Sequence, residues 1–232
     1  MAIEFMLHPT TSTILIEKLG TFFTEKMPFN SLFPKNDLKI TSEHPFVDLM
    51  QATNSTPAMV KSKFPSLIVI NTNSGYCLDL AVTYRETVFD IKLLEDLQTH
   101  RGDRYICSDR TVCLIEQAFK ESDTLSANMF NVPRQDQIVL ELWTTNSIMS
   151  KKTYSILHTV LLGDIRKWLH DEYAIELDIT TIGGEPEGIY NLDFGERLYG
   201  SKLFFSLQYM TTQFTIDKCI DIDEVVVHTN PE

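Results

Sequence analysis

Hydrophobic residues recur at helical spacing in two segments of the chain. In residues 12–27 and again in residues 150–173, apolar side chains return every three or four positions, which is typical of a helix with one buried face. Hydroxyl side chains at residues 10–13 can cap the first helix, and Pro28 ends it. The stripes are Leu15, Leu19, Phe22, Phe23 and Lys26 in the first segment, and Tyr154, Leu157, Leu161, Ile165, Trp168 and Leu169 in the second.

Strictly alternating hydrophobic residues predict β-strands elsewhere. Residues 64–70 form a short apolar run, residues 71–75 have turn composition, and alternation follows over residues 76–84, which predicts a hairpin with one buried face. Phe89, Ile91 and Leu93 continue the alternation in a changed phase, so we expect the chain to stay extended there after a bulge. Residues 105–120 are typical of a strand followed by a helix.

The C-terminal half adds further strands. We expect them at residues 138–143, 175–179 and 203–210, where apolar side chains alternate with others. The glycine-rich residues 183–188 read as a hairpin tip, because Glu185 and Glu187 would repel a phosphate that a glycine loop could otherwise bind. Residues 225–227 either close the sheet or form its edge.

Two segments have no periodicity. Residues 28–64 contain Pro34, Pro45 and Pro57 and predict an extended arm or loop insertion, and residues 121–137 predict a loop. This order of helices and strands predicts an α+β fold: a largely antiparallel β-sheet with helices packed on one face, plus a long arm near the N-terminus. The length of 232 residues allows one elaborated domain or two small ones, and we expect a single domain over residues 1–232.

The net charge of the chain limits the classes of partner that it can bind. There are 32 acidic and 20 basic residues, a formal net charge of −12, which disfavours binding to a phosphate backbone. No segment has the length and hydrophobicity of a membrane span, so we expect a soluble protein made in a cytoplasm, without membrane or specific nucleic-acid binding. Four separate cysteines without a CxxC pair predict buried free thiols; they are Cys77, Cys107, Cys113 and Cys219.

One group of residues suggests catalysis. Asp79 on one expected strand, with Asp90 and Lys92 on the next, matches how nucleases of the PD-(D/E)xK type place carboxylates on Mg²⁺ and a lysine beside the attacked phosphate. The alternative is that all three occupy the solvated phase of their strands, which the alternation favours. A Mg²⁺-dependent nuclease is therefore the alternative function, and the favoured prediction is that the chain is not an enzyme.

Other chemistry-bearing motifs are missing from the sequence. The six histidines show no zinc-binding spacing, and no nucleophile elbow or phosphate-binding glycine loop is present. The acidic residues near the C-terminus could hold a cation, but a solvated strand edge explains them better; they are Asp217, Asp221, Asp223 and Glu224. We predict no cofactor and no bound metal.

The layout of residues 137–212 resembles a known family. A strand, a turn with Asn146 and Ser147, an amphipathic helix containing residues 165–169, a strand, a glutamate-rich tip and a strand over residues 203–209 are similar to the tail-terminator proteins of tailed bacteriophages. The resemblance implies a structural virion protein: a subunit of a ring, most often a hexamer, that caps the tail tube and joins tail or neck proteins, assembled in the host cytoplasm. A baseplate or other phage connector protein is a further alternative.

The resemblance also implies where the contacts lie. The family has no catalytic residue to carry over, and the candidate assembly contacts are the arm, represented by Phe29, Phe33 and Phe46, and the hairpin tip, represented by Gly183, Glu185 and Glu187. An acidic ring lumen would let DNA slide without binding.

Overall fold

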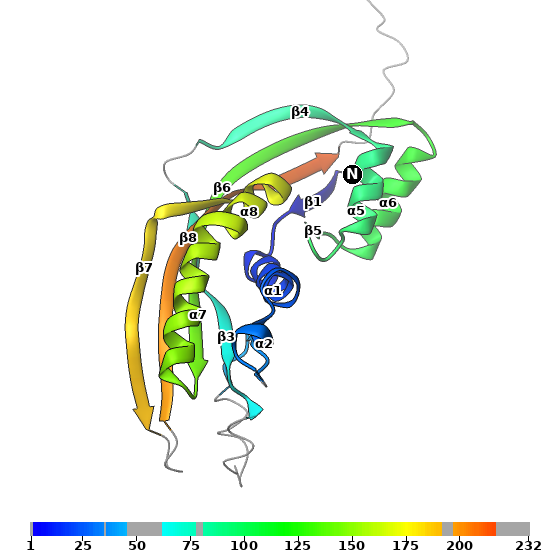
Figure 1. The fold of residues 1–232 in the computed structure, drawn as a ribbon. Helices are drawn as coiled ribbons and strands as arrows, with labels where there is room; N and C mark the ends of the chain where they lie inside the picture. Colours follow the sequence, from blue (N-terminus) through cyan, green and yellow to red (C-terminus); the bar gives the residue numbers. More distant parts are fainter. Residues whose placement is uncertain (1, 35, 46–61, 78–80, 192–196, 217–232) are drawn as a thin grey trace, which may run out of the picture. The chain divides into compact units, whose positions relative to one another are not determined.

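The computed structural model describes residues 2–34, 36–45, 62–77, 81–191 and 197–216. The chain separates into two compact units. Unit 1 comprises Met1–His8, Val82–Val132 and Thr211–Glu232, and unit 2 comprises Pro9–Ala81 and Pro133–Met210. Two long strands, β6 (Thr124–Thr144) and β8 (Arg197–Ile216), contribute to both (Figure 1). Whether the chain acts as one domain stays a prediction.

Unit 2 is a sheet with helices on one face. Its strand order is β2-β3-β6-β8-β7, in which β2 (Lys39–Thr41) runs parallel to β3 (Ser66–Tyr76), whereas β6 is antiparallel to β3, and β7 (Glu176–Asn191) is antiparallel to β8. Two helical segments cover the sheet. The first is α1 (Thr11–Thr21), the π-helical turn η1 (Phe22–Lys26) and the short α2 (Phe29–Leu32); the second is α7 (Ser147–Val160), η2 (Leu161–Ile165) and α8 (Arg166–Tyr173).

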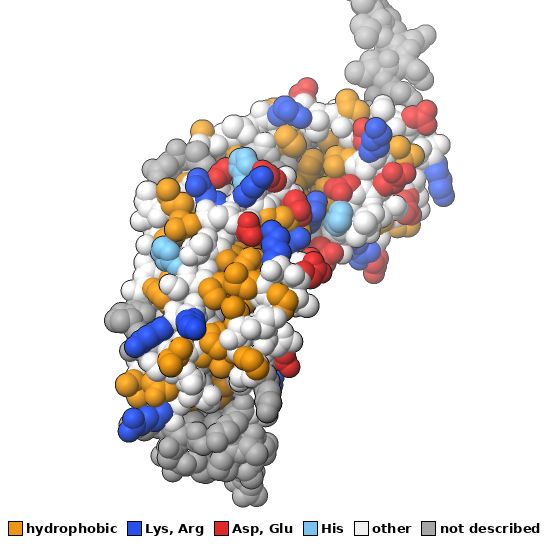
Figure 2. Space-filling view, viewed as in Figure 1, with side chains coloured by type: hydrophobic (Ala, Val, Ile, Leu, Met, Phe, Trp, Pro, Cys, Tyr) orange, Lys and Arg blue, Asp and Glu red, His pale blue; other side chains and the backbone are white. Residues whose placement is uncertain are grey.

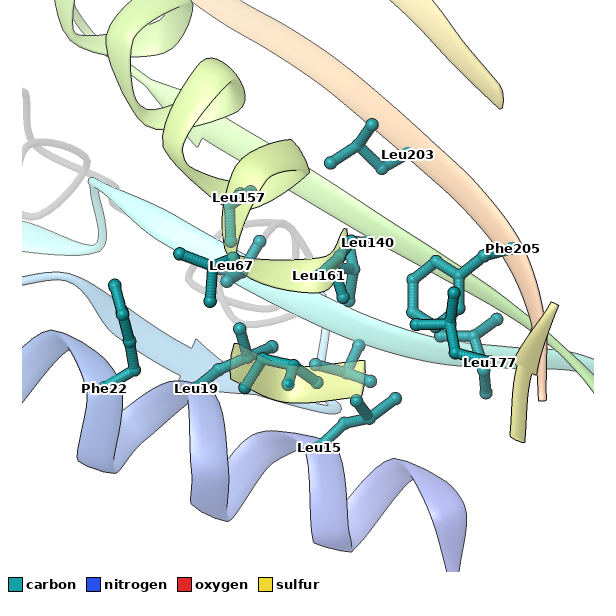
Figure 3. Close-up of a cluster of buried hydrophobic side chains, with 14 of the residues drawn as sticks. Leu15, Leu19, Phe22, Leu67, Leu140, Leu157, Leu161, Leu177, Leu203 and Phe205 are labelled. Atoms are coloured by element: carbon teal, nitrogen blue, oxygen red, sulfur yellow. The ribbon is translucent and has the colours of Figure 1, made fainter. Parts of the chain in front are cut away.

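Leucine-rich stripes from sheet and helices form the core of unit 2. Leu15 and Leu19 of α1 are fully buried and point toward Leu67 of β3 and Leu140 of β6 in Figure 3. The second helical segment contributes Leu157, Leu161, Ile165 and Leu169, which pack with Leu203, Phe205 and Leu207 of β8. Burying side chains of this size contributes about 1.5–3 kcal/mol each, so this cluster fixes the helices on the sheet.

Unit 1 repeats the same plan with different elements. Its strand order is β4-β6-β8-β1-β5, from β4 (Thr83–Asp90), β1 (Ile3–Leu7) and β5 (Tyr105–Ile106), with α5 (Ile91–Thr99) and α6 (Asp109–Phe119) packed on one face. Phe5 stacks on Phe214 at a centroid distance of 4.8 Å and meets Phe89 edge-on at 5.5 Å. Both units therefore confirm the predicted α+β fold.

Several predicted elements are confirmed. The helix expected at residues 12–27 is α1 continued by η1, the helix expected at residues 150–173 is α7, η2 and α8, and residues 105–120 form β5 followed by α6. The alternation in β8 also holds, because Leu203, Phe205, Leu207 and Tyr209 are buried.

The predicted arm is wrong over its described residues. Phe29 begins α2 and is 3% exposed in the core of unit 2, where its ring packs against Phe23, and β2 pairs with β3. Prolines broke the hydrophobic pattern into pieces too short to detect, but the pieces still pack. Residues 46–61 lie outside the described part of the chain.

The predicted loop at residues 121–137 is also wrong, because β6 covers most of it. At its start the buried Leu125 and Ala127 alternate with the polar Thr124, Ser126 and Asn128. Pro133 is tolerated because β4 pairs with β6 up to Asn131 and β3 pairs from Arg134 onward, so Pro133 lies between the two ladders.

Two turn predictions and one strand prediction fail. Residues 71–75 do not turn the chain but continue β3, paired with β6, with one register shift between Asn71 and Asn73. Gly183 and Gly184 lie inside β7, opposite Phe204 and Leu203. Ile91 and other residues expected on a strand begin helix α5. Long-range pairing thus overrides local turn composition.

The cysteines follow the prediction in part. Cys77, Cys107 and Cys113 are free thiols, and Cys77 is buried as expected. Cys113 is exposed on α6, so the expectation that it is buried is wrong. Cys219 and residues 225–227 lie outside the described part of the chain.

Candidate functional site

The edge of unit 1 is a regular, unpaired strand. β4 pairs with β6 without interruption from Thr83 opposite Asn131 to Asp90 opposite Thr124. Within the described residues β4 has no partner on its other side. Natural edge strands are usually short, bulged, or protected by Pro or charged side chains, especially Lys. β4 is eight residues long and has no bulge, Pro or Lys, and its exposed charges are Arg85, Glu86 and, at its end, Asp90. Its backbone can therefore accept another strand.

On the face of β4 and β6 that points away from α5 and α6, three apolar side chains are exposed, and the charged Glu86 lies between two of them. Tyr84 and Val88 are 55% and 60% exposed, and Phe130 of the neighbouring strand β6 is 40% exposed. The rings of Tyr84 and Phe130 lie 5.0 Å apart, and the Tyr84 hydroxyl donates a hydrogen bond of 2.7 Å to Asn128. These contacts hold Tyr84 and Phe130 in a fixed arrangement that can dock a partner. We call Tyr84, Val88 and Phe130 the β4 patch.

The sequence pattern predicted a strand over residues 76–84, but Tyr76 ends β3 and β4 begins only at Thr83. We expected the alternating residues Tyr76, Val82 and Tyr84 to line a buried face, yet all three are more than half exposed. Alternation alone reports which side chains share a face, not whether anything covers that face. This is why sequence analysis missed the β4 patch.

Unit 2 offers a second edge. β7 pairs only with β8 in the part of the chain that the structure describes. Its exposed apolar residues are Ile179 and Ile189, and its register shifts twice, between Asp178 and Gly183 and between Glu185 and Gly188. The side chains of Glu185 and Glu187 are outside the described part of the structure.

The predicted nuclease residues do not share the expected strands. Asp90 ends β4 and caps helix α5 by accepting a hydrogen bond of 3.0 Å from the backbone N–H of Leu93. Lys92 lies in α5 and is exposed, not on a strand beside Asp90. Asp79 lies outside the described residues. Asp90 therefore has a structural role that needs no metal.

The residues predicted as assembly contacts lie in different environments. Phe29 is buried and contacts the rings of Phe23 and Phe33, so it is part of the core rather than a free contact. Phe33 is half-buried against the same core. Gly183 lies on the edge strand β7, and Phe46 lies outside the described residues.

A charged cluster lies on the face of unit 2 away from the helices. Glu141 of β6 is 8% exposed; it accepts hydrogen bonds from Lys202 Nζ at 2.8 Å and from the indole N–H of Trp143 at 3.3 Å, and His44 Nε2 lies 3.4 Å away. Burial by itself raises the pKa of Glu141, but these hydrogen bonds and the charges of Lys202 and His44 outweigh burial, so the pKa lies below its ordinary value. The carboxylate is thus held ionised.

A second polar cluster lies between α1 and the sheet. Asp136 is 2% exposed and accepts hydrogen bonds from the hydroxyls of Thr11, at 2.6 Å, and Tyr209, at 3.2 Å. Burial, followed by the charge and hydrogen bond of Asp136, raises the pKa of Tyr209, and Arg134 opposes this effect. The cluster anchors the start of α1 on β6 and β8.

Neither cluster forms a metal site. In the described ranges, no three His, Cys, Asp or Glu side chains are grouped so that they could hold a metal ion. None of the described helices has the length and hydrophobicity to cross a membrane.

The sequence matches no protein-family model, and a search of curated proteins finds no relative.

Proposed function

We propose that this chain is a ring-forming structural subunit of a tailed phage, a tail terminator or neck component that joins the tail tube to the head-proximal connector. It acts through its surfaces, with tail-tube, sheath or neck proteins as partners, in the virion after assembly in the host cytoplasm. The observation that carries the proposal is the β4 edge with its exposed apolar patch.

The β4 edge favours assembly because a free, regular edge strand is a template for unwanted pairing unless a partner covers it. Here Tyr84 and Val88 of the β4 patch lie on the edge strand itself, and Phe130 lies on the neighbouring strand β6. A second copy that adds a strand to β4 would satisfy the backbone groups and bury Tyr84 and Val88 together.

A closed ring also needs two different surfaces, because head-to-tail contacts join one patch to another. β4 in unit 1 and β7 in unit 2 are separate edges with different sequences, and each carries exposed apolar residues. A twofold dimer would need only one of them. The resemblance to tail terminators favours six copies in the ring.

The alternative functions differ in what they require. A baseplate or other phage connector would use the same kind of surfaces, and partner identity separates it from a terminator. The nuclease alternative gains no support from the described residues, because Asp90 caps a helix and Lys92 lies in that helix.

The experiment that tests the proposal is the mass of the full-length protein in solution, measured by light scattering after size exclusion over a range of concentration and salt. We expect a species with the mass of six chains of 26.6 kDa, visible as rings by electron microscopy. Val88→Lys places a charge on the β4 patch and should release monomers.

Ile148→Lys is the matched control, because Ile148 is 64% exposed on α7 and lysine again replaces an exposed β-branched aliphatic residue. It should leave the mass unchanged. A wild-type chain that stays monomeric at every concentration, or a Val88→Lys variant with the wild-type mass, would contradict assembly through β4.

A further inference from the structure

A groove of about 410 Å³ lies beside α1 in unit 2. One wall is a single face of α1 and η1, and the other comes from the chain around α2 and β2. On the face seen in Figure 2, hydrophobic side chains gather over α1, α2 and α7. The lining residues are Ile16, Glu17, Gly20, Phe23 and Thr24 from the first wall and Pro28, Phe29, Asn30, Asp37, Leu38 and Ile40 from the second.

Two features of the helical wall are unusual for a helix. Gly20 lies inside α1, where glycine is less stable than alanine by roughly 0.5–1 kcal/mol. A Cβ added at Gly20 would meet no atom within 4 Å, so no neighbour requires a glycine. The helix then continues as the π-helical turn η1, a form that is frequent at functional sites. The same pair of features occurs at Gly163 in η2, but at Gly20 it coincides with the groove.

The charges at the groove are acidic and have no ion-pair partner among the described residues. Glu17 and Asp37 are the charged residues of the described lining. The basic residues of the same helical segment point elsewhere: Lys18 packs over Trp168 at 4.0 Å, and Lys26 pairs with Asp164 at 3.1 Å. The groove therefore combines an apolar floor, made by Phe23 and Phe29, with a negative rim.

We propose that this groove binds a short basic segment of a partner protein. An aliphatic or aromatic side chain of that segment lies over Gly20, and a neighbouring Lys or Arg pairs with Glu17 or Asp37. This inference rests on the groove alone and does not depend on ring assembly through β4.

The groove is long enough to hold a short peptide segment. Ile16 and Thr24 mark the ends of the helical wall, and eight residues of helix span about 12 Å. That distance matches about four residues of extended chain. The acidic rim excludes an acidic segment, because an unpaired carboxylate beside Glu17 and Asp37 would be repelled.

The test uses the full-length protein and a display library of short random peptides, selected on immobilised wild-type chain. We expect the recovered peptides to share a Lys or Arg next to a large apolar residue. The strongest peptide, labelled and measured by fluorescence anisotropy, should lose affinity by about tenfold or more on Gly20→Leu, which fills the groove. The double variant Glu17→Lys, Asp37→Lys should weaken binding to a similar extent.

Two matched controls separate binding from folding. Gly163→Leu makes the same exchange at another helical glycine whose Cβ would meet open space, and Glu121→Lys reverses an exposed charge in unit 1. Both should keep the wild-type affinity, and Gly20→Ala should raise the midpoint of thermal unfolding because it removes a helical glycine.

Three results would overturn the proposal. The first is recovery of no binding peptide, or of peptides without an excess of basic residues. The second is equal affinity for wild type and Gly20→Leu. The third is a change in oligomeric state on Gly20→Leu in the absence of peptide, which would identify a second copy of the chain as the occupant.

Discussion

Gly200 of β8 lies directly against the indole ring of Trp143. A Cβ built on Gly200 would come within 2.8 Å of ring atom Cζ3 and 3.0 Å of Cη2 of Trp143. Trp143 is 6% exposed and is also held by its hydrogen bond to Glu141, so its ring cannot move away easily. Glycine is thus required at this position by close packing rather than by a turn.

Gly200→Ala should therefore destabilise the protein. Overpacking against a fixed ring typically costs about 1–3 kcal/mol, and we expect a loss in this range in urea unfolding. Gly75→Ala is the control, because Gly75 also lies in a strand but its Cβ would meet open space. An unfolding free energy for Gly200→Ala equal to that of the control would show that Trp143 can shift.

Removing only Lys202 from the Glu141 cluster should lower the unfolding free energy more than replacing both Lys202 and Glu141. Lys202→Met leaves the carboxylate of Glu141 buried without its strongest partner. Because Lys202 is about one-third exposed and Trp143 still donates, we expect a loss of about 2 kcal/mol, below the value for a fully buried pair. Adding Glu141→Gln to Lys202→Met should recover part of the lost unfolding free energy in a double-mutant cycle. A loss from Lys202→Met that Glu141→Gln does not reduce would contradict the pairing.

The buried Tyr209 makes stability depend on alkaline pH. Its pKa is raised in the folded state, so it contributes stability that is present below the unfolded value of about 10 and is lost as the pH rises above it. Tyr209→Phe should cost about 1 kcal/mol at neutral pH through the lost hydrogen bond to Asp136. It should also flatten the decline of stability above pH 10.

In Tyr209→Phe the loss of stability above pH 10 should become shallower but not vanish. Burial and the hydrogen bond to Asp96 also raise the pKa of Tyr105, which remains in this variant. Urea unfolding at several pH values from neutral to strongly alkaline measures both effects. The same alkaline slope in wild type and Tyr209→Phe would show that Tyr209 ionises freely in the folded protein.

How far the sequence predicts this structure depends on what covers each face. The stripe of α7 and η2 and the alternation of β8 were predicted correctly, because one side of each is packed in the core of unit 2. Residues 71–75 and Gly183 were assigned to turns from local composition, but pairing with distant strands holds both in β-structure.

The candidate site was harder to predict than the fold. Among the described residues nothing covers the β4 patch, and no property of Tyr84 or Val88 alone reveals this. The groove beside α1 joins Gly20 to Asp37 across two segments, and its only signal in the sequence is a glycine inside a helical pattern.

Asp90 gives the sharpest test between a structural and a catalytic role. Its carboxylate caps α5, so Asp90→Ala should lower the unfolding free energy by about 1 kcal/mol. Asp90→Asn should restore most of that stability, because Asn caps helices as well as Asp does. Lys92→Ala serves as a control, since the lysine side chain is exposed, and should change stability little.

A metal ligand behaves differently, because an amide does not replace a carboxylate on Mg²⁺. Mg²⁺-dependent DNA cleavage by the wild-type chain that is lost in both Asp90→Asn and Lys92→Ala would overturn the capping role as the sole function of Asp90.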